Sequence, residues 1–157
     1  MATTNADGVF LDTNVLVYAV VEDGPLYATA RRAIKECAPG PAACWISRQV
    51  LREFIATLTR PQPFAPPFPP SVVVRQARHF EVSFRLAEDG PGVTQRLLEL
   101  VEQFPLGGKR IHDANIVATM LAHGIPKLLT HNTNDFLAFS NLIEIKPLKA
   151  YAGNTAF

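Results

Sequence analysis

Three acidic residues stand where a folded chain could use them for chemistry rather than for solubility. Asp12 follows the apolar run VFL, Glu53 borders the apolar face of an expected helix, and Asp113 lies in the first turn of a mostly apolar helix. Carboxylates that are forced together repel, and a divalent cation relieves that repulsion, so the three favour a hard metal such as Mg²⁺ or Mn²⁺. Taken singly, each also fits a structural role, such as a helix cap or a charge favoured by the helix dipole.

The elements expected around these acids alternate between strand and helix. Short apolar runs predict strands at residues 9–11, 44–46, 127–130 and 142–145. Helical spacing and capping residues predict helices from about residue 15, from 25 to 37, from 47 to 58, from 94 to 104 and from 111 to 123, while residues 72–84 fit helix or strand.

This alternation is typical of an α/β fold with a short parallel sheet, here of four to five strands, flanked by helices on both faces. In such a sheet, residues at the carboxyl ends of strands and at the starts of the following helices gather on one edge, where ligands bind. We therefore expect Asp12, Glu53 and Asp113 to meet at that edge.

Length and composition predict one domain over residues 1–157, because 157 residues with 48% hydrophobic side chains suffice for one core. Residues 61–70 contain six of the 13 prolines and are expected to form a stiff surface loop inside that domain, although a proline-rich ligand for a partner is the alternative. The net charge of +1 means that any contact with nucleic acid is local or assisted by metal.

The cysteines and the N-terminal region indicate a cytoplasmic protein. Cys37 and Cys44 have neither zinc-ligand spacing nor a disulfide framework, which favours a reducing compartment. The longest N-terminal apolar stretch is residues 15–21, which is too short for a membrane span and lacks the basic flank of a signal peptide. We expect no targeting segment and no contact with a membrane.

The chain lacks residues that three other enzyme classes require for their chemistry. A phosphotransferase of the haloacid dehalogenase kind needs an aspartate two residues after Asp12, where this chain has Asn14. Ser47 is not flanked by the glycines of a serine hydrolase, and Gly108-Lys109 lacks the other residues of a phosphate-binding P-loop.

Four sequence blocks, in order, are similar to those of a known family. They are FLDTNVL at residues 10–16, ISRQVLREF at 46–54, HDANIVA at 112–118 and LTHNTNDF at 129–136. Together they resemble the PIN-domain family, and within it the VapC-type ribonuclease toxins of toxin-antitoxin pairs. The resemblance extends from Val9 to Ile145 and implies a single compact domain with an acidic pocket that binds a divalent metal.

The resemblance also assigns expected roles to individual residues. By matching position, Asp12, Glu53 and Asp113 are the three main acids, and Asp135 is expected to supply the fourth charge. The family often has an acid where this chain has Asn132, so one bound metal is a safer expectation than two. The expected supporting residues, which orient the acids or a water or cap helices, are Thr13, Asn14, Ser47, Thr130 and Asn132.

The implied activity is metal-dependent hydrolysis of RNA phosphodiesters by an endoribonuclease toxin. Asp12 and Asp113 would be the primary ligands of Mg²⁺ or Mn²⁺, Glu53 would orient or deprotonate the attacking water, and Asp135 would complete the acidic ring. Lys109 and Arg110 would hold RNA phosphates, or are ordinary loop charges. A cognate antitoxin and a homodimer are the partners that the resemblance implies. The alternative is a catalytically inactive PIN-like module that binds RNA or protein, and cleavage of DNA also stays open.

Overall fold

Five short strands form a wholly parallel sheet in the computed structural model, which describes residues 5–153. The strand order is β3-β2-β1-β4-β5. The strands are β1 (Val9–Leu11), β2 (Cys44–Ile46), β3 (Arg85–Leu86), β4 (Lys127–Thr130) and β5 (Glu144–Pro147). Three predicted strands have the predicted bounds, whereas β5 begins two residues later than expected and the two-residue edge strand β3 is too short for any sequence pattern to indicate it.

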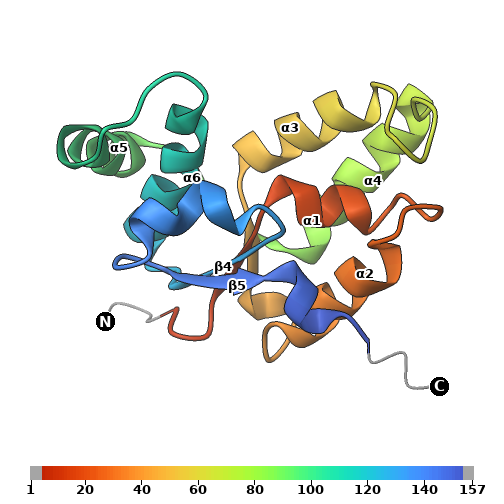
Figure 1. Cartoon of the computed structure of the whole chain (residues 1–157), viewed down its shortest axis with the longest axis horizontal. Coiled ribbons are helices and arrows are strands. Elements are labelled where there is room, and N and C mark those ends of the chain that lie inside the picture. Colours follow the sequence, from red (N-terminus) through yellow and green to blue (C-terminus); the bar gives the residue numbers. More distant parts are fainter. Residues whose placement is uncertain (1–4, 154–157) are drawn as a thin grey trace.

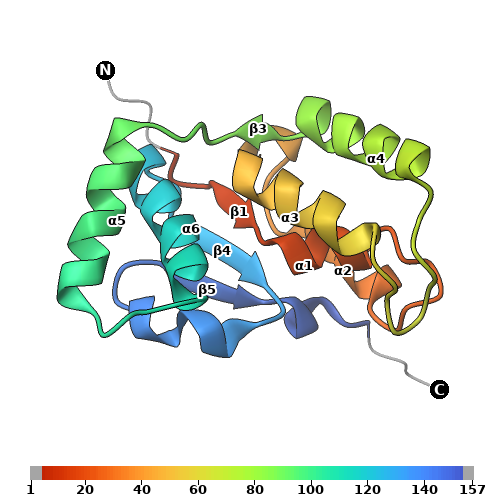
Figure 2. The same ribbon diagram turned by 90° about the horizontal axis from the view of Figure 1, so that it is seen from above.

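The helices cover both faces of the sheet, as the alternation of strands and helices predicted. Figure 1 shows α6 and α2 on opposite sides of the sheet, and Figure 2 shows α5 lying beside α6 and α3 beside α4. The α-helices are α1 (Thr13–Tyr18), α2 (Tyr27–Glu36), α3 (Arg48–Leu58), α4 (Pro70–Ser83), α5 (Pro91–Gln103) and α6 (Arg110–His123). Short 3-10 helices are η1 (Pro41–Ala43), η2 (Thr133–Phe139) and η3 (Leu148–Tyr151).

Local signals in the sequence explain where the elements end. Of residues 72–84, which fitted helix or strand, residues 72–83 belong to α4 and Phe84 is extended just after it; Pro70 occupies the first turn, where the missing N–H costs no hydrogen bond. Gly124 ends α6 with φ +66°, a left-handed conformation that glycine adopts without strain. The start of α2 is at Tyr27 rather than at Pro25.

The core surrounds the central strand, β1, and the helix α6. All of β1 is buried, and α6 has buried side chains on both of its sides, including Ile116, Val117 and Met120, as its apolar composition predicted. Cys37 and Cys44 are buried free thiols. None of the helices in residues 5–153 is long and apolar enough to cross a membrane. The predicted domain boundaries at residues 1 and 157 fall outside the described residues.

The strand order creates a position for a ligand beside β1. Because β2 pairs with one side of β1 and β4 with the other, the connections leave the carboxyl ends of β1 and β4 in different directions, which opens a crevice there. The Asp12 N–H donates to the Leu129 carbonyl at 3.0 Å and holds the two strand ends together. Asp12 therefore projects from the edge at which the sheet geometry predicts ligand binding.

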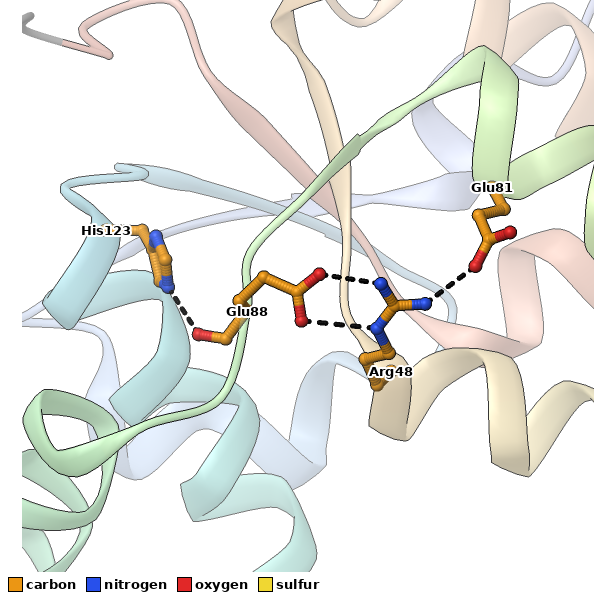
Figure 3. Close-up of polar contacts among 4 residues, drawn as sticks. All are labelled: Arg48, Glu81, Glu88 and His123. Atoms are coloured by element: carbon orange, nitrogen blue, oxygen red, sulfur yellow. Dashed lines mark hydrogen bonds and ion pairs between the residues drawn. The ribbon is translucent and has the colours of Figure 1, made fainter.

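A polar network ties the start of α3 to its neighbours (Figure 3). The Arg48 guanidinium contacts Glu81 of α4 at 2.6 Å and Glu88, which follows β3, at 2.7 Å. The Glu88 carbonyl lies 2.8 Å from the His123 Nε2 atom at the end of α6. The three charged side chains are exposed, so their ion pairs stabilise the fold only weakly, but the network spans the helices that carry Glu53 and Asp113.

Candidate active site

A pocket of about 370 Å³ lies at the carboxyl edge of the sheet and contains four carboxylates. Asp12 comes from the end of β1, Glu53 from the second turn of α3, Asp113 from the first turn of α6, and Asp135 from η2. The structure thus brings together the three acids that the residue pattern indicated and the fourth that the resemblance added. The other residues that line the pocket are Thr13, Asn14, Val17, Tyr18, Thr57, Gln62 and Asn132.

Asp12 is the most enclosed of the four acids, with 6% of its surface exposed. Its Oδ1 atom accepts the Thr13 N–H at 2.8 Å, which caps α1 as the sequence predicted. Its Oδ2 atom accepts the Thr130 hydroxyl at 2.7 Å and the Asn14 side-chain amide at 3.0 Å. Burial raises the pKa of Asp12 above its ordinary value, and these hydrogen bonds lower it in part.

Glu53 receives a hydrogen bond on each carboxylate oxygen. The Thr13 hydroxyl donates to Oε2 at 2.8 Å, and the Gln49 side-chain amide donates to Oε1 at 2.9 Å. Thr13 belongs to α1 and Gln49 to the same helix as Glu53, so two elements fix the direction of this carboxylate. A carboxylate held in this way is suited to orient a water molecule or a ligand.

The surroundings of Asp113 oppose its ionisation. Burial, together with the charges of Asp135, Asp12 and Glu53, raises its pKa to about 6, while the nearby Arg110 lowers it slightly. Within residues 5–153 no hydrogen bond lowers this pKa. A cation bound beside Asp113 would replace a proton there and relieve the repulsion from the other acids.

The donor set fits a hydrated Mg²⁺ or Mn²⁺ ion better than a closed metal cage. In the described part of the chain, no three His, Cys, Asp or Glu side chains are arranged to hold an ion by themselves. Mg²⁺ is usually bound through only one or two carboxylates and keeps several waters, so a pocket with four acidic side chains and room for water suits it. All four acids present oxygen ligands, which hard divalent cations prefer.

Some predicted residues support the pocket without lining it. The Thr130 side chain is fully buried, and its hydroxyl donates to Asp12 from the core side of the pocket. The same hydroxyl oxygen accepts the Asn132 N–H at 3.0 Å. Ser47 caps α3 by accepting the Val50 N–H at 3.3 Å and does not line the pocket. Lys109 and Arg110 are exposed at the start of α6, outside the lining residues.

Two residues beside the pocket, Gln49 and Asn115, had no role in the sequence analysis, and neither did four that line it, Val17, Tyr18, Thr57 and Gln62. Gln49 contacts Glu53 and also donates to the His112 carbonyl at 3.0 Å, and the Asn115 side-chain amide donates to Gln49 at 2.8 Å. Gln49 lies four residues before Glu53, a spacing that brings side chains together on a helix and could have indicated this contact. Nothing in the sequence indicated the contact between Gln49 and Asn115, because it joins two helices.

Comparisons with known proteins agree with this architecture. The PIN domain family model matches residues 9–142. Ribonuclease VapC48 of Mycobacterium tuberculosis is 25% identical over 136 residues, which cover 83% of this chain and 91% of that protein.

Two solved structures share the fold of the chain. One is the Sarcin-Ricin loop cleaving toxin VapC20 of Mycobacterium tuberculosis, with 18% identity and a TM-score of 0.66 over 89% of this chain and 100% of that one. The other is a toxin-antitoxin complex from Klebsiella pneumoniae, with 20% identity and a TM-score of 0.64 over 90% of this chain and 98% of that one.

Proposed function

Because this chain belongs to the PIN-domain family, we propose that it is a metal-dependent endoribonuclease and the toxin of a toxin-antitoxin pair. The observation that carries the proposal is the convergence of Asp12, Glu53, Asp113 and Asp135 on one pocket at the carboxyl edge of the sheet. The ribonuclease named VapC48, which matches most of this chain, supports the same activity.

The four acids divide the work according to their surroundings. Asp113 and Asp12 are the proposed primary ligands of Mg²⁺ or Mn²⁺, because burial and like charges oppose the ionisation of Asp113 and Asp12 is the most buried of the four acids. The ion supplies Lewis acidity, which neutralises negative charge on the phosphodiester. Glu53 is a further proposed ligand of the ion, directly or through a water that it orients and from which it accepts the proton, since two hydrogen bonds fix the direction of its carboxylate. Asp135 is exposed and completes the acidic ring at the pocket mouth.

Neutral side chains keep these acids in place. Asn14 donates to Asp12 and accepts the His131 N–H at 3.0 Å, so it connects the end of β1 to the segment after β4. Thr130 holds Asp12 from the core side, and Asn132 lies at the pocket wall. At the start of α6, Lys109 and Arg110 are free to contact RNA phosphates next to Asp113.

The proposed partners are an antitoxin and a second copy of the chain. Solved structures that share this fold include a toxin-antitoxin complex, which supports an antitoxin partner; we propose that this partner covers the acidic pocket. An Arg or Lys of the antitoxin would pair with the carboxylates there. The catalytically inactive PIN-like module is the weaker reading, because a binding module has no need of four acids in one pocket.

Cleavage of a mixed RNA pool by the purified chain, with added Mg²⁺ or Mn²⁺ and with a chelator control, tests the activity. Asp113→Asn removes one charge and is expected to lower the rate by more than roughly 100-fold, the usual scale for loss of a catalytic group. The matched control is Asp23→Asn, because Asp23 is exposed and lies outside the pocket of the four acids. It should cut RNA at the wild-type rate.

Intact RNA with every metal, from protein that is folded by circular dichroism, would favour the binding-module alternative. Cutting that persists unchanged in Asp113→Asn would assign the activity to a contaminant or to a different site. A duplex DNA substrate in the same assay decides between RNA and DNA.

A further inference from the structure

The Gln49 side chain lies between the two helices that carry Glu53 and Asp113. Its Nε2 atom donates to Glu53 Oε1 at 2.9 Å and to the His112 carbonyl of α6 at 3.0 Å. Its Oε1 atom accepts the Asn115 Nδ2 group at 2.8 Å. One side-chain amide thus makes three hydrogen bonds, two of which cross from α3 to α6.

Groups of α6 and the Glu53 carboxylate together determine which way the Gln49 amide faces. A Gln amide can rotate by half a turn and exchange its oxygen and nitrogen, and only the surrounding partners fix the choice. The Glu53 carboxylate and the His112 carbonyl can only accept hydrogen bonds and therefore require the Gln49 nitrogen, which leaves the Gln49 oxygen to accept the Asn115 amide N–H. The opposite rotation would place the Gln49 oxygen against the Glu53 carboxylate.

The direction of Glu53 therefore depends on a residue of α6. Asn115 lies two residues after Asp113 on that helix, so the same helix that carries Asp113 also orients Gln49 and, through it, Glu53. The second oxygen of Glu53 is held separately by the Thr13 hydroxyl at 2.8 Å.

We propose that Gln49, oriented by the His112 carbonyl and Asn115 of α6, is a positioning residue that fixes the Glu53 carboxylate relative to Asp113 across the pocket. This role rests on the proposed nuclease function. Partners that orient metal-site carboxylates typically contribute about 10- to 100-fold in metal affinity or activity, and we expect Gln49→Met to fall in that range.

The chain contains a second Gln–Glu pair with the same spacing on a helix, which serves as a control. Gln95 on α5 donates to Glu99, four residues later, at 3.3 Å, and both side chains lie away from the pocket of the four acids. Gln95→Met removes the same type of helix contact on the surface. We expect that substitution to change Mn²⁺ affinity and RNA cleavage by less than about twofold, since such a pair adds only a few tenths of a kcal/mol to a helix.

A test of the geometry needs neither RNA nor metal. The side-chain amide signals of Gln49 in a ¹H–¹⁵N NMR spectrum of the metal-free protein should shift in Glu53→Ala and again in Asn115→Leu. The signals of Gln95 should stay in place in both variants. If the Gln49 signals are unchanged in Glu53→Ala, the contact does not exist in solution and the proposal fails.

A double-mutant cycle separates positioning from general support of the fold. If Gln49 acts through Glu53, Gln49→Met weakens Mn²⁺ binding, read by electron paramagnetic resonance, about 10- to 100-fold in the wild type but less than about twofold in Glu53→Gln. A structural role would give the same factor in both backgrounds, and that outcome would overturn the proposal. Asn115→Leu, which leaves Gln49 in place, serves as the second variant if Gln49→Met folds poorly and should follow the same pattern.

The two proposals can fail separately. If the wild type binds Mn²⁺ and passes the NMR and cycle tests but cuts no RNA, the nuclease function fails while the positioning role stands. If it cuts RNA but Gln49→Met binds Mn²⁺ and cuts RNA as the wild type does, only the positioning role fails.

Discussion

Replacing Thr130 by valine is the sharpest test of how the fold keeps a buried carboxylate ionised. Thr130 is fully buried, and its hydroxyl donates to Asp12 Oδ2 at 2.7 Å. Valine has nearly the same shape but no hydroxyl, so the change removes the hydrogen bond and leaves the packing. A hydrogen bond to a charged group contributes about 1.5–3 kcal/mol, and we expect the metal-free protein to lose that much unfolding free energy at pH 7.5.

The loss should depend on pH in a predictable direction. Burial raises the pKa of Asp12 above 3.8, and the Thr130 hydrogen bond is the strongest of the contacts that lower it again. Removing the hydroxyl therefore raises the pKa further. A carboxyl whose folded pKa exceeds its unfolded value loses stability as the pH rises between the two values. The cost of Thr130→Val is thus largest above the pKa that Asp12 has in the folded protein, and it shrinks as the pH falls through that pKa toward 3.8, because the carboxyl then becomes protonated in both proteins.

Urea unfolding with a chelator present, at pH 7.5 and near pH 4.5, measures this difference. Thr119→Val is the matched control, because Thr119 is also buried and its hydroxyl donates at 2.7 Å to a neutral acceptor, the Asn115 carbonyl. The control should cost about 0.5–1.5 kcal/mol at both pH values. Equal losses for the two variants, or a Thr130→Val loss that does not change with pH, would refute the electrostatic reasoning.

Three further outcomes follow from the charges of the site and the surface. The pKa of Asp113 is about 6 in the metal-free protein, so protons compete with the cation below that pH. The Mn²⁺ affinity should therefore fall as the pH drops from 7 to 5, and Asp113→Asn should make the affinity depend less on pH. Asn132→Asp adds an acid to the pocket wall and should tighten Mn²⁺ binding or raise its stoichiometry in calorimetry; unchanged binding would show that residue 132 faces away from the ion. Arg48→Ala breaks two exposed ion pairs and should lower the unfolding free energy in urea only slightly, with a still smaller loss in high salt, because water and salt screen exposed charges.

Much of the fold was predictable because its signals are local. The apolar runs that form β1, β2 and β4 are bounded by capping residues, and Gly124 marks the end of α6 by itself. The ambiguity over residues 72–84 had a physical cause, since three consecutive valines favour a strand while the spacing of Val73 and Phe80 places them on one buried helical face. β3 is a strand because it pairs with β2, and its own two residues carry no strand signal.

The site was predictable to the level of its acids and no further. Asp12, Glu53 and Asp113 could be chosen because each follows a recognisable strand or helix boundary, and a parallel sheet collects such positions on one edge. The direction in which each carboxylate faces depends on side chains from other elements, such as Thr130 for Asp12 and Gln49 for Glu53. Contacts of that kind join residues that are distant in the sequence or on separate helices, and no periodic pattern records them.

The hydrogen bonds in the pocket also explain why the four acids are not equivalent. Donors from the protein face both oxygens of Asp12 and both oxygens of Glu53, so the fold itself bears much of the cost of keeping these two carboxylates charged. Asp113 has the opposite situation, because burial and three like charges oppose its ionisation, and the charge of Arg110 offsets them only in part. A cation that enters the pocket therefore relieves repulsion at Asp113, while Asp12 and Glu53 offer it oxygens that are already fixed in direction. One hydrated ion close to Asp113 fits this arrangement of charges. Asn132 in the pocket wall is neutral, so a second ion would find fewer negatively charged ligands.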